Sequence, residues 1–289
     1  MSGRRRLRTF AWPATAAVAA ALLLVPAVAS GQTPSSIPIV VEKATNGNVE
    51  AELWHRGHRY FRVRITRDGT LVYDKRIRGR CAEFCTPTES ALTGERIGFR
   101  DLDGDGEPEV IVDLFTGGAS CCVLVLAYGY DAAANTYRRA ELDAGGGFVV
   151  RDPDDDGVLE LQGDDFRFRG LFTCGACGPR PIRIWHYGPG RFEVVTRDFP
   201  GRIRIHARRL RGFYARVRDD GEAAFVKGAL TPLVADLCLL DRCGRGFRLV
   251  RAAIRRGELE RRSAFDVSPL GVRYLRALRR FLRRTGYLG

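Results

Sequence analysis

Residues 101–110 read "DLDGDGEPEV" and place Asp101, Asp103 and Asp105 on alternate positions, with Gly106 directly after them. Three carboxylates this close repel one another, so the spacing predicts a cation among them. Alternate carboxylates converge as a loop curls, and a glycine permits the sharp bend that such a loop needs. The pattern therefore indicates a hard divalent cation held by oxygen ligands. Calcium is favoured over magnesium, which takes fewer protein carboxylates and keeps more of its water.

The EF-hand is the first candidate for a loop of this kind, and the sequence excludes it. An EF-hand loop needs glutamate at its twelfth position, whereas counting from Asp101 gives Val112. The flanking residues are also typical of strands rather than helices. An acid stands instead at the ninth position, Glu109, and an apolar run follows it directly.

A second stretch repeats the design 51 residues later, where residues 152–161 read "DPDDDGVLEL". Asp152, Asp154 and Asp156 take the alternate positions, and Glu160 takes the ninth. Both copies follow an apolar residue and an arginine. Two matched copies predict repeated supersecondary units that each hold one cation. The alternative interpretation is a pair of solvated Asp/Gly turns without metal.

These loops resemble the calcium loops of FG-GAP and VCBS-type repeats, which occur in the β-propellers of integrin α chains and in many secreted bacterial proteins. In that family, acids at positions one, three, five and nine and the backbone carbonyl at position seven bind calcium. The resemblance implies two calcium ions. For the first it implies Asp101, Asp103, Asp105, the carbonyl of Glu107, and Glu109. For the second it implies Asp152, Asp154, Asp156, the carbonyl of Val158, and Glu160.

The resemblance covers residues 95–165, and glutamate stands at position nine where the family usually has aspartate. Only two copies are visible, so a closed propeller built from this chain alone is not expected. The element "GGASCC" at 117–122 also resembles a group of exported bacterial proteins of uncharacterised function. That second resemblance implies no activity.

The first 29 residues have the three-part plan of a secretory signal peptide. Four arginines precede an apolar run, which ends at the small-residue site Ala27-Val28-Ala29. The sequence thus predicts export by the Sec or twin-arginine route, with residues 30–38 as a short leader. No later segment approaches the ~20 apolar residues that a membrane span needs.

Eight cysteines in an exported chain indicate disulfides. They form four couples close in sequence, namely Cys81/Cys85, Cys121/Cys122, Cys174/Cys177 and Cys238/Cys243, although the sequence leaves the connectivity open. The "CGAC" stretch at 174–177 also admits zinc binding or thiol redox chemistry. A redox cysteine of that type opens a helix, and Gly178-Pro179-Arg180-Pro181 argues against one here.

The chain divides by pattern into two regions. Residues 39–200 consist of short alternating runs separated by Gly and Asp, which predict strands, with a hairpin turn at Arg67-Asp68-Gly69. Residues 201–289 carry apolar residues at three- and four-residue spacing, which predict three or four helices, the last capped by Ser268 and Pro269. The expected fold is mainly β, with short antiparallel strands in partial propeller-like or sandwich-like repeats, and a C-terminal helical region.

Charge is concentrated in the helical region. The whole chain has a net charge of +13, and residues 201–289 hold 22 basic and 8 acidic side chains, a balance of +14. Such a region is able to contact an anionic membrane surface or cell-envelope polymer. The alternative is a helical face that is merely solvated, since arginine is favoured throughout the chain. Export argues against nucleic acid as the partner.

The sequence therefore predicts an exported, disulfide-containing, calcium-stabilised binding or envelope-associated module without catalytic activity. The alternative is a secreted enzyme, either a thiol oxidoreductase using Cys174 and Cys177 or a hydrolase using loop carboxylates. The pair Asp164-Asp165 is a poor hydrolase centre, because adjacent residues of a strand face opposite sides. No Ser/His/Asp arrangement with a G-x-S-x-G element occurs in the chain.

Overall fold

The first sheet is an antiparallel meander of four strands. Strands β1 (Val40–Asn46), β2 (Val49–Arg56), β3 (Tyr60–Arg67) and β4 (Thr70–Arg76) pair in chain order. Burial alternates along β2 and β3, as expected of a sheet with one covered face. Asp68 and Gly69 form the β3–β4 turn with φ of 50° and 74°. The hairpin predicted at this point is confirmed.

The second sheet lies in the middle of the β part and is buried on both faces. It contains β5 (Thr86–Thr88), β6 (Ile97–Arg100), β7 (Glu109–Phe115), β8 (Val123–Asp131) and β9 (Thr136–Gly145). Along β7, Val110 and Val112 pack against the first sheet, whereas Ile111 packs toward the third. Because both faces are covered, β7 and β8 read as nearly continuous apolar runs.

The third sheet connects the β part to the helices. Strands β10 (Phe148–Arg151), β11 (Glu160–Asp164), β12 (Ile182–Gly188) and β13 (Arg191–Val194) again pair in chain order, and the short 3-10 helices Phe166–Phe168 and Thr196–Asp198 lie near them in the chain. Trp185 and Tyr187 of β12 pack toward the central sheet. Ile182 and Ile184 of the same strand meet Ile203 of the first long helix.

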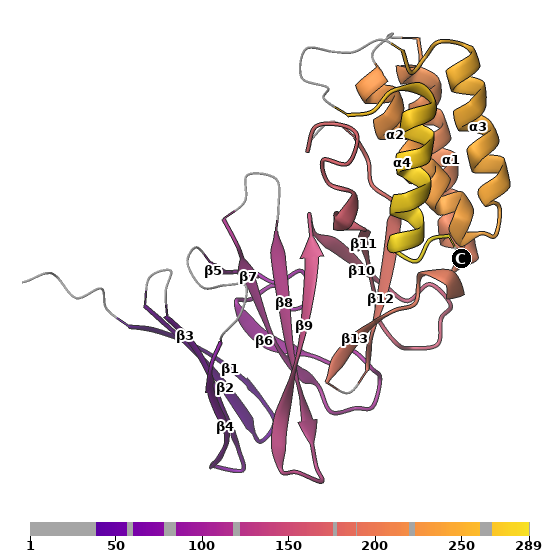
Figure 1. The fold of residues 1–289 in the computed structure, drawn as a ribbon. Helices are drawn as coiled ribbons and strands as arrows, with labels where there is room; N and C mark the ends of the chain where they lie inside the picture. Colours follow the sequence, from indigo (N-terminus) through magenta and orange to yellow (C-terminus); the bar gives the residue numbers. More distant parts are fainter. Residues whose placement is uncertain are drawn as a thin grey trace, which may run out of the picture. The chain divides into compact units, whose positions relative to one another are not determined.

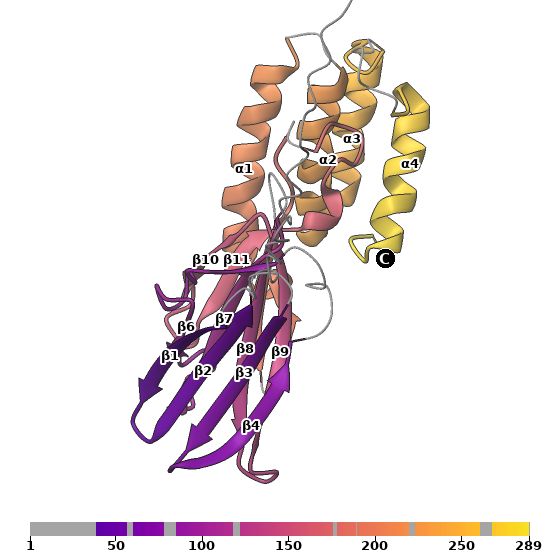
Figure 2. The ribbon, with the colours of Figure 1, turned by 90° about the vertical axis from the view of Figure 1, so that its left-hand side faces the viewer.

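Four helices follow the last strand (Figure 1): α1 (Pro200–Val217), α2 (Ala223–Leu239), α3 (Cys243–Arg255) and α4 (Gly271–Arg284). Helix α2 is buried along almost its whole length, and α1 and α4 flank it on opposite sides in Figure 2. A helix that is apolar all round needs such cover. The predicted helical region is thus confirmed.

The predicted start of α4 was wrong. The helix begins at Gly271 after Leu270 rather than at Ser268. The Ser268 hydroxyl donates instead to the carbonyl of Phe172 at 3.1 Å, and it accepts a hydrogen bond from Lys227. A hydroxyl engaged in a tertiary network does not act as a local cap.

The structure is a computed structural model. It describes residues 39–56, 60–77, 85–117, 122–175, 178–188, 190–219, 223–260 and 268–288. The predicted signal peptide and leader lie outside these ranges. Residues Ile37–Gly289 form one compact unit, mainly β with C-terminal helices, as the sequence predicts. None of the helices in these ranges combines the length and the apolar composition of a membrane span.

Candidate metal centre

Both acidic loops join the two strands of a hairpin in the same way. We call residues 101–109 the first loop and residues 152–160 the second loop. Arg100 pairs with Glu109 across β6 and β7, and Arg151 pairs with Glu160 across β10 and β11. Position nine is therefore the first residue of the returning strand in both loops. The backbone pairing of the two strands sets which face of the sheet its side chain is on.

The aspartate at position one organises each loop. Asp101 Oδ2 accepts a hydrogen bond from the Gly106 N–H at 3.1 Å, and Asp152 Oδ2 accepts one from the Gly157 N–H at 3.0 Å. These contacts close each loop around its own first carboxylate. A carboxylate oxygen has lone pairs to spare, so accepting an N–H leaves it able to bind a cation.

Backbone conformation also matches between the loops. Positions four and six have positive φ in both: Gly104 at 73° and Gly106 at 81°, Asp155 at 60° and Gly157 at 88°. This region suits glycine, and Asp155 adopts it at a cost of about 1 kcal/mol. The two stretches thus share one loop geometry, which similarity of sequence alone does not guarantee.

In the first loop, the carboxylates of Asp101, Asp103 and Glu109 come together. One oxygen of each lies within 4.8 Å of the others. Asp105 and Glu107 do not join this trio, but with Asp103 and Glu109 they line a cavity of about 270 Å³. Four of the five predicted residues of this loop therefore face one cavity.

In the second loop, Asp152, Asp154 and Asp156 offer oxygens within 4.8 Å of one another. Glu160 stands outside this trio, with 3% of its surface exposed. Its Oε1 lies 3.8 Å from Nδ1 of His186, the residue opposite it on β12. The second loop is more open than the first, because Asp154 and Asp156 are exposed.

The position-nine glutamates sit in an electrostatic setting that disfavours their charge. Burial, with the nearby carboxylates of Asp103 and Asp105 adding to it, raises the pKa of Glu109 to about 8. Burial, together with Asp154, raises the pKa of Glu160 to about 7. A divalent cation between the carboxylates would reverse both effects, because it favours the ionised form.

Unpartnered oxygens provide the test of whether a cation fits. Within the two loops, Asp103 Oδ1 and Glu160 Oε2 are buried without a hydrogen-bond partner. Buried polar atoms are rarely left in this state. One such oxygen in each loop, beside further carboxylates, fits the six to eight oxygen ligands that calcium takes.

The loops contact each other, which the sequence did not indicate. The N–H of Leu159 donates to the carbonyl of Leu102 at 3.3 Å. A side chain at Gly104 would touch Val158. Leu102 itself is fully buried in the core between the central and third sheets. The two candidate sites therefore share a wall of backbone and apolar side chains.

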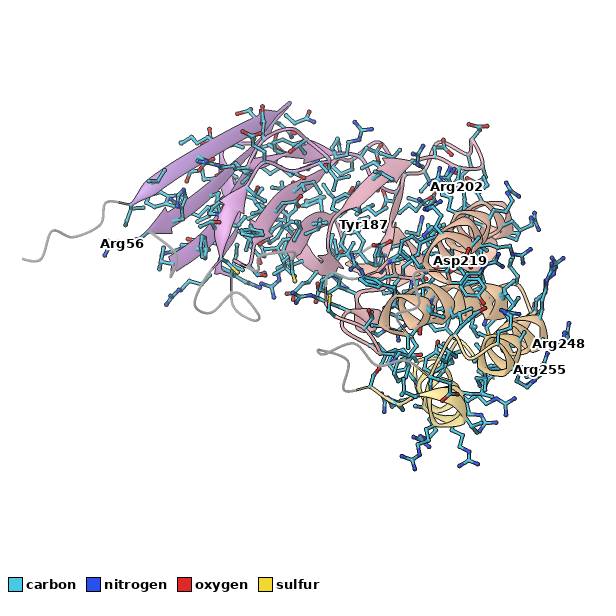
Figure 3. The ribbon with its side chains drawn as sticks, turned by 90° about the horizontal axis from the view of Figure 1, so that it is seen from above. Arg56, Tyr187, Arg202, Asp219, Arg248 and Arg255 are labelled. Atoms are coloured by element: carbon cyan, nitrogen blue, oxygen red, sulfur yellow. A yellow bond between two sulfur atoms is a disulfide. The ribbon has the colours of Figure 1, made fainter. Side chains whose placement is uncertain are left out.

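Two further residues that contact or line the first loop could not be identified from the sequence. Arg67, in β3, holds Glu107 by a two-pronged ion pair with contacts of 2.6 and 3.0 Å. Tyr187, labelled in Figure 3, lines the cavity from β12, and its buried hydroxyl lies against Gly129. No local pattern marks these residues, since each reaches the loop from a distant strand.

All five described cysteines are in disulfides, namely Cys85, Cys122, Cys174, Cys238 and Cys243. The bond between Cys238 and Cys243 confirms one of the couples that are close in sequence. The other three couples each include a residue outside the described ranges: Cys81, Cys121 and Cys177.

The two adjacent acids Asp164 and Asp165 are held in ion pairs. Asp165 is almost fully buried and lies 3.0 Å from Arg183, and Arg167 donates to both of its carboxylate oxygens. Asp164 pairs with Arg180 at 3.1 Å. These contacts explain the two adjacent acids as structural ties between β11 and its surroundings.

No protein-family model, curated protein or solved structure matches this chain. The resemblance to FG-GAP and VCBS repeats therefore remains an interpretation of the two loops.

Proposed function

We propose that the chain is an exported, non-catalytic binding module whose β part is stabilised by two calcium ions and whose helical part contacts an anionic component of the cell envelope. One observation carries the proposal. Two loops with the same hairpin geometry each converge three carboxylates, and each contains a buried oxygen without a partner. Bound calcium would neutralise these oxygens and fix the turns of two neighbouring sheets.

Calcium stabilises under this proposal because it binds the native loops and not the unfolded chain. At a free concentration one hundred times the dissociation constant, each site adds about 2.7 kcal/mol. Two such sites raise the melting temperature of a chain of this size by roughly 10 °C or more. The test is a thermal melt of residues 30–289 with excess calcium and again with a chelator.

Variants of the two loops test whether the calcium-dependent shift in melting temperature arises from them. Asp103→Asn removes a carboxylate from the first loop, and Asp154→Asn removes one from the second. Each variant is expected to lose about half of the calcium-dependent shift. Asp131→Asn is the matched control, since Asp131 lines the same cavity but is paired with Arg138 outside the loops. A calcium shift that survives in both loop variants places the ion elsewhere and removes the basis of the proposal.

A further inference from the structure

Helices α3 and α4 present a surface made almost wholly of arginine. Neither helix contains an aspartate or glutamate. The exposed arginines of α3 are Arg245, Arg248, Arg251 and Arg255. Those of α4 are Arg273, Arg276, Arg279, Arg280, Arg283 and Arg284. We call these ten side chains the arginine face.

The arginines of each helix share one side of it. At about 100° per residue, the four on α3 fall within an arc of roughly 120° and the six on α4 within roughly 140°. The opposite sides are buried in the helical core, through residues such as Phe247, Leu278 and Leu282. Figure 3 shows Arg248 and Arg255 projecting outward from α3.

One contact joins the two sets into a single face. The Arg279 guanidinium of α4 lies over the Phe247 ring of α3, 4.7 Å from its centroid. This cation–π contact places a charge from α4 at the seam between the helices. The arginine face therefore extends across both helices and for about 16 Å along α4, from Arg273 to Arg284 at 1.5 Å per residue.

The acids of the described part of the chain do not pair with this face, although the Glu260 carboxylate lies close to Gly271 at the start of α4. None of its ten arginines makes an ion pair there. The nearby Glu258 is already paired with Arg256 and accepts a hydrogen bond from Tyr214. Neighbouring arginines one turn apart are about 5–6 Å from each other at Cβ, well inside the Debye length of about 8 Å at physiological salt. Their mutual repulsion is relieved when an anion binds.

The chemistry of the face selects the kind of anion. A helix that lies in a membrane surface inserts exposed apolar side chains between lipids. Here the apolar sides of both helices are used in the core, and Val272 is the one large apolar side chain exposed among their described residues. Guanidinium groups instead bind phosphate oxygens in a two-pronged geometry.

We propose that the arginine face binds a linear polymer of repeating phosphate groups in the cell envelope. This inference rests on the proposed function, which places the chain outside the cytoplasm in contact with an anionic envelope component. An extended polymer suits a face about 16 Å long, because successive phosphates meet successive turns of α4. The face binds through its charges and hydrogen bonds, so binding weakens steeply with added salt.

The test is a calorimetric titration of residues 30–289 with synthetic poly(glycerol phosphate) at 150 mM salt, with calcium present. The variant Arg276→Gln/Arg280→Gln/Arg283→Gln removes three charges from the arginine face. The control, Arg204→Gln/Arg208→Gln/Arg211→Gln, removes three exposed arginines from α1. We expect at least a tenfold loss of affinity for the first variant and less than a threefold loss for the control.

A lysine variant and a comparison with lipid vesicles complete the test. The variant Arg276→Lys/Arg280→Lys/Arg283→Lys keeps the charge but not the guanidinium geometry, and an intermediate loss is expected. Vesicles of phosphatidylglycerol are expected to bind at least tenfold more weakly than the polymer at equal phosphate. Equal losses for the α4 variant and the α1 control overturn the proposal, as does tighter binding to vesicles or no binding to the polymer. Calcium stabilisation that persists in that last case would leave the proposed role of the loops intact.

Discussion

Asp113 is a buried carboxylate in the middle of a strand and makes the stability of the fold depend on pH. It lies in β7 with 1% of its surface exposed, and its Oδ1 has no hydrogen-bond partner. Burial raises its pKa to about 7, against the opposing effect of the Ser90 hydroxyl. An unfolded aspartate has a pKa of about 3.9, so between these two values the native state keeps a proton that the unfolded chain has released.

The free energy of unfolding therefore falls as pH rises from about 4 to about 7, and this contribution levels off above that. A shift of three pKa units corresponds to a loss of about 4 kcal/mol. Asp113→Asn is expected to remove this slope, so that the variant gains stability relative to the parent at pH 8. Urea unfolding at pH 5 and pH 8 with calcium present measures it. Asp241→Asn, at a side chain 94% exposed, should retain the parent slope, and an equal slope in Asp113→Asn contradicts the assignment.

Gly129 is required by the position of one tyrosine hydroxyl. A Cβ at Gly129 would overlap the Tyr187 hydroxyl, and it would lie 3.5 Å from Oε1 of Glu109. The Tyr187 ring is fully buried and stacks edge-on against Phe192 at 5.3 Å, so it has little room to move. Gly129→Ala is expected to destabilise the fold by about 1–3 kcal/mol through overpacking.

A second substitution separates this clash from any other effect of the extra methyl group. In Gly129→Ala/Tyr187→Phe the overlapping oxygen is gone, and most of the lost stability should return. Denaturant unfolding of the parent, both single variants and the double variant gives the coupling energy. Additive effects, with no recovery in the double variant, would show that the hydroxyl is not what excludes a side chain at Gly129.

The disulfide between Cys238 and Cys243 fixes the turn from α2 into α3. Cys238 is buried at the end of α2, and Cys243 opens α3. Because the closed loop is short, the bond removes a limited number of unfolded conformations, worth about 2 kcal/mol. Cys238→Ser/Cys243→Ser is expected to lose about that much stability in urea unfolding under oxidising conditions. When the parent and the variant are both reduced, their free energies of unfolding should become equal. A difference that persists after reduction would indicate that the substitutions cost packing rather than a disulfide.

The acidic loops were predictable because their information is local. Gly106 and Gly157, whose positive φ allows each loop to turn, are next in sequence to the aspartates that the loop brings together. The contact between Leu102 and Leu159 was not predictable. It joins residues far apart in the chain through backbone atoms, which leave no mark on side-chain pattern. The prediction of the α4 cap was wrong for the same reason. Ser268 precedes a proline, as a helix cap often does, but its hydroxyl bonds to Phe172, which is far away in the chain.

The sequence distinguished the strands from the helices but did not show how the β part and the helical part meet. Periodicity reports which face of an element is apolar and not what covers it. Strand β12 reads as one strand, yet Trp185 faces the central sheet while Ile184 faces α1. That division makes the third sheet a layer between the central sheet and the helices, and the second loop ends at β11, which pairs with β12.

Asp236 ties these layers together. It is fully buried in α2, accepts a hydrogen bond from the Ile182 N–H of β12 at 3.3 Å, and lies 2.7 Å from Nδ1 of His206 in α1. Burial raises its pKa to about 6 despite the histidine beside it. Asp236→Ala leaves the buried Ile182 N–H and the His206 ring without their acceptor. An unsatisfied buried polar group costs about 1–3 kcal/mol, so the variant should loosen the helices from the third sheet.

Tryptophan fluorescence and circular dichroism follow the unfolding of the strands and of the helices separately. Outside the predicted signal peptide, the tryptophans are Trp54 and Trp185, both in strands, whereas circular dichroism at 222 nm follows mainly the helices. The parent should give coincident transitions, because the helices and β12 share a core. In Asp236→Ala the helical signal should melt first, and the exposed control Asp219→Ala should behave as the parent does. Coincident transitions in Asp236→Ala would mean that the apolar contacts of Ile203 alone couple the layers, whereas separate transitions in the parent would make the helices an independent folding unit.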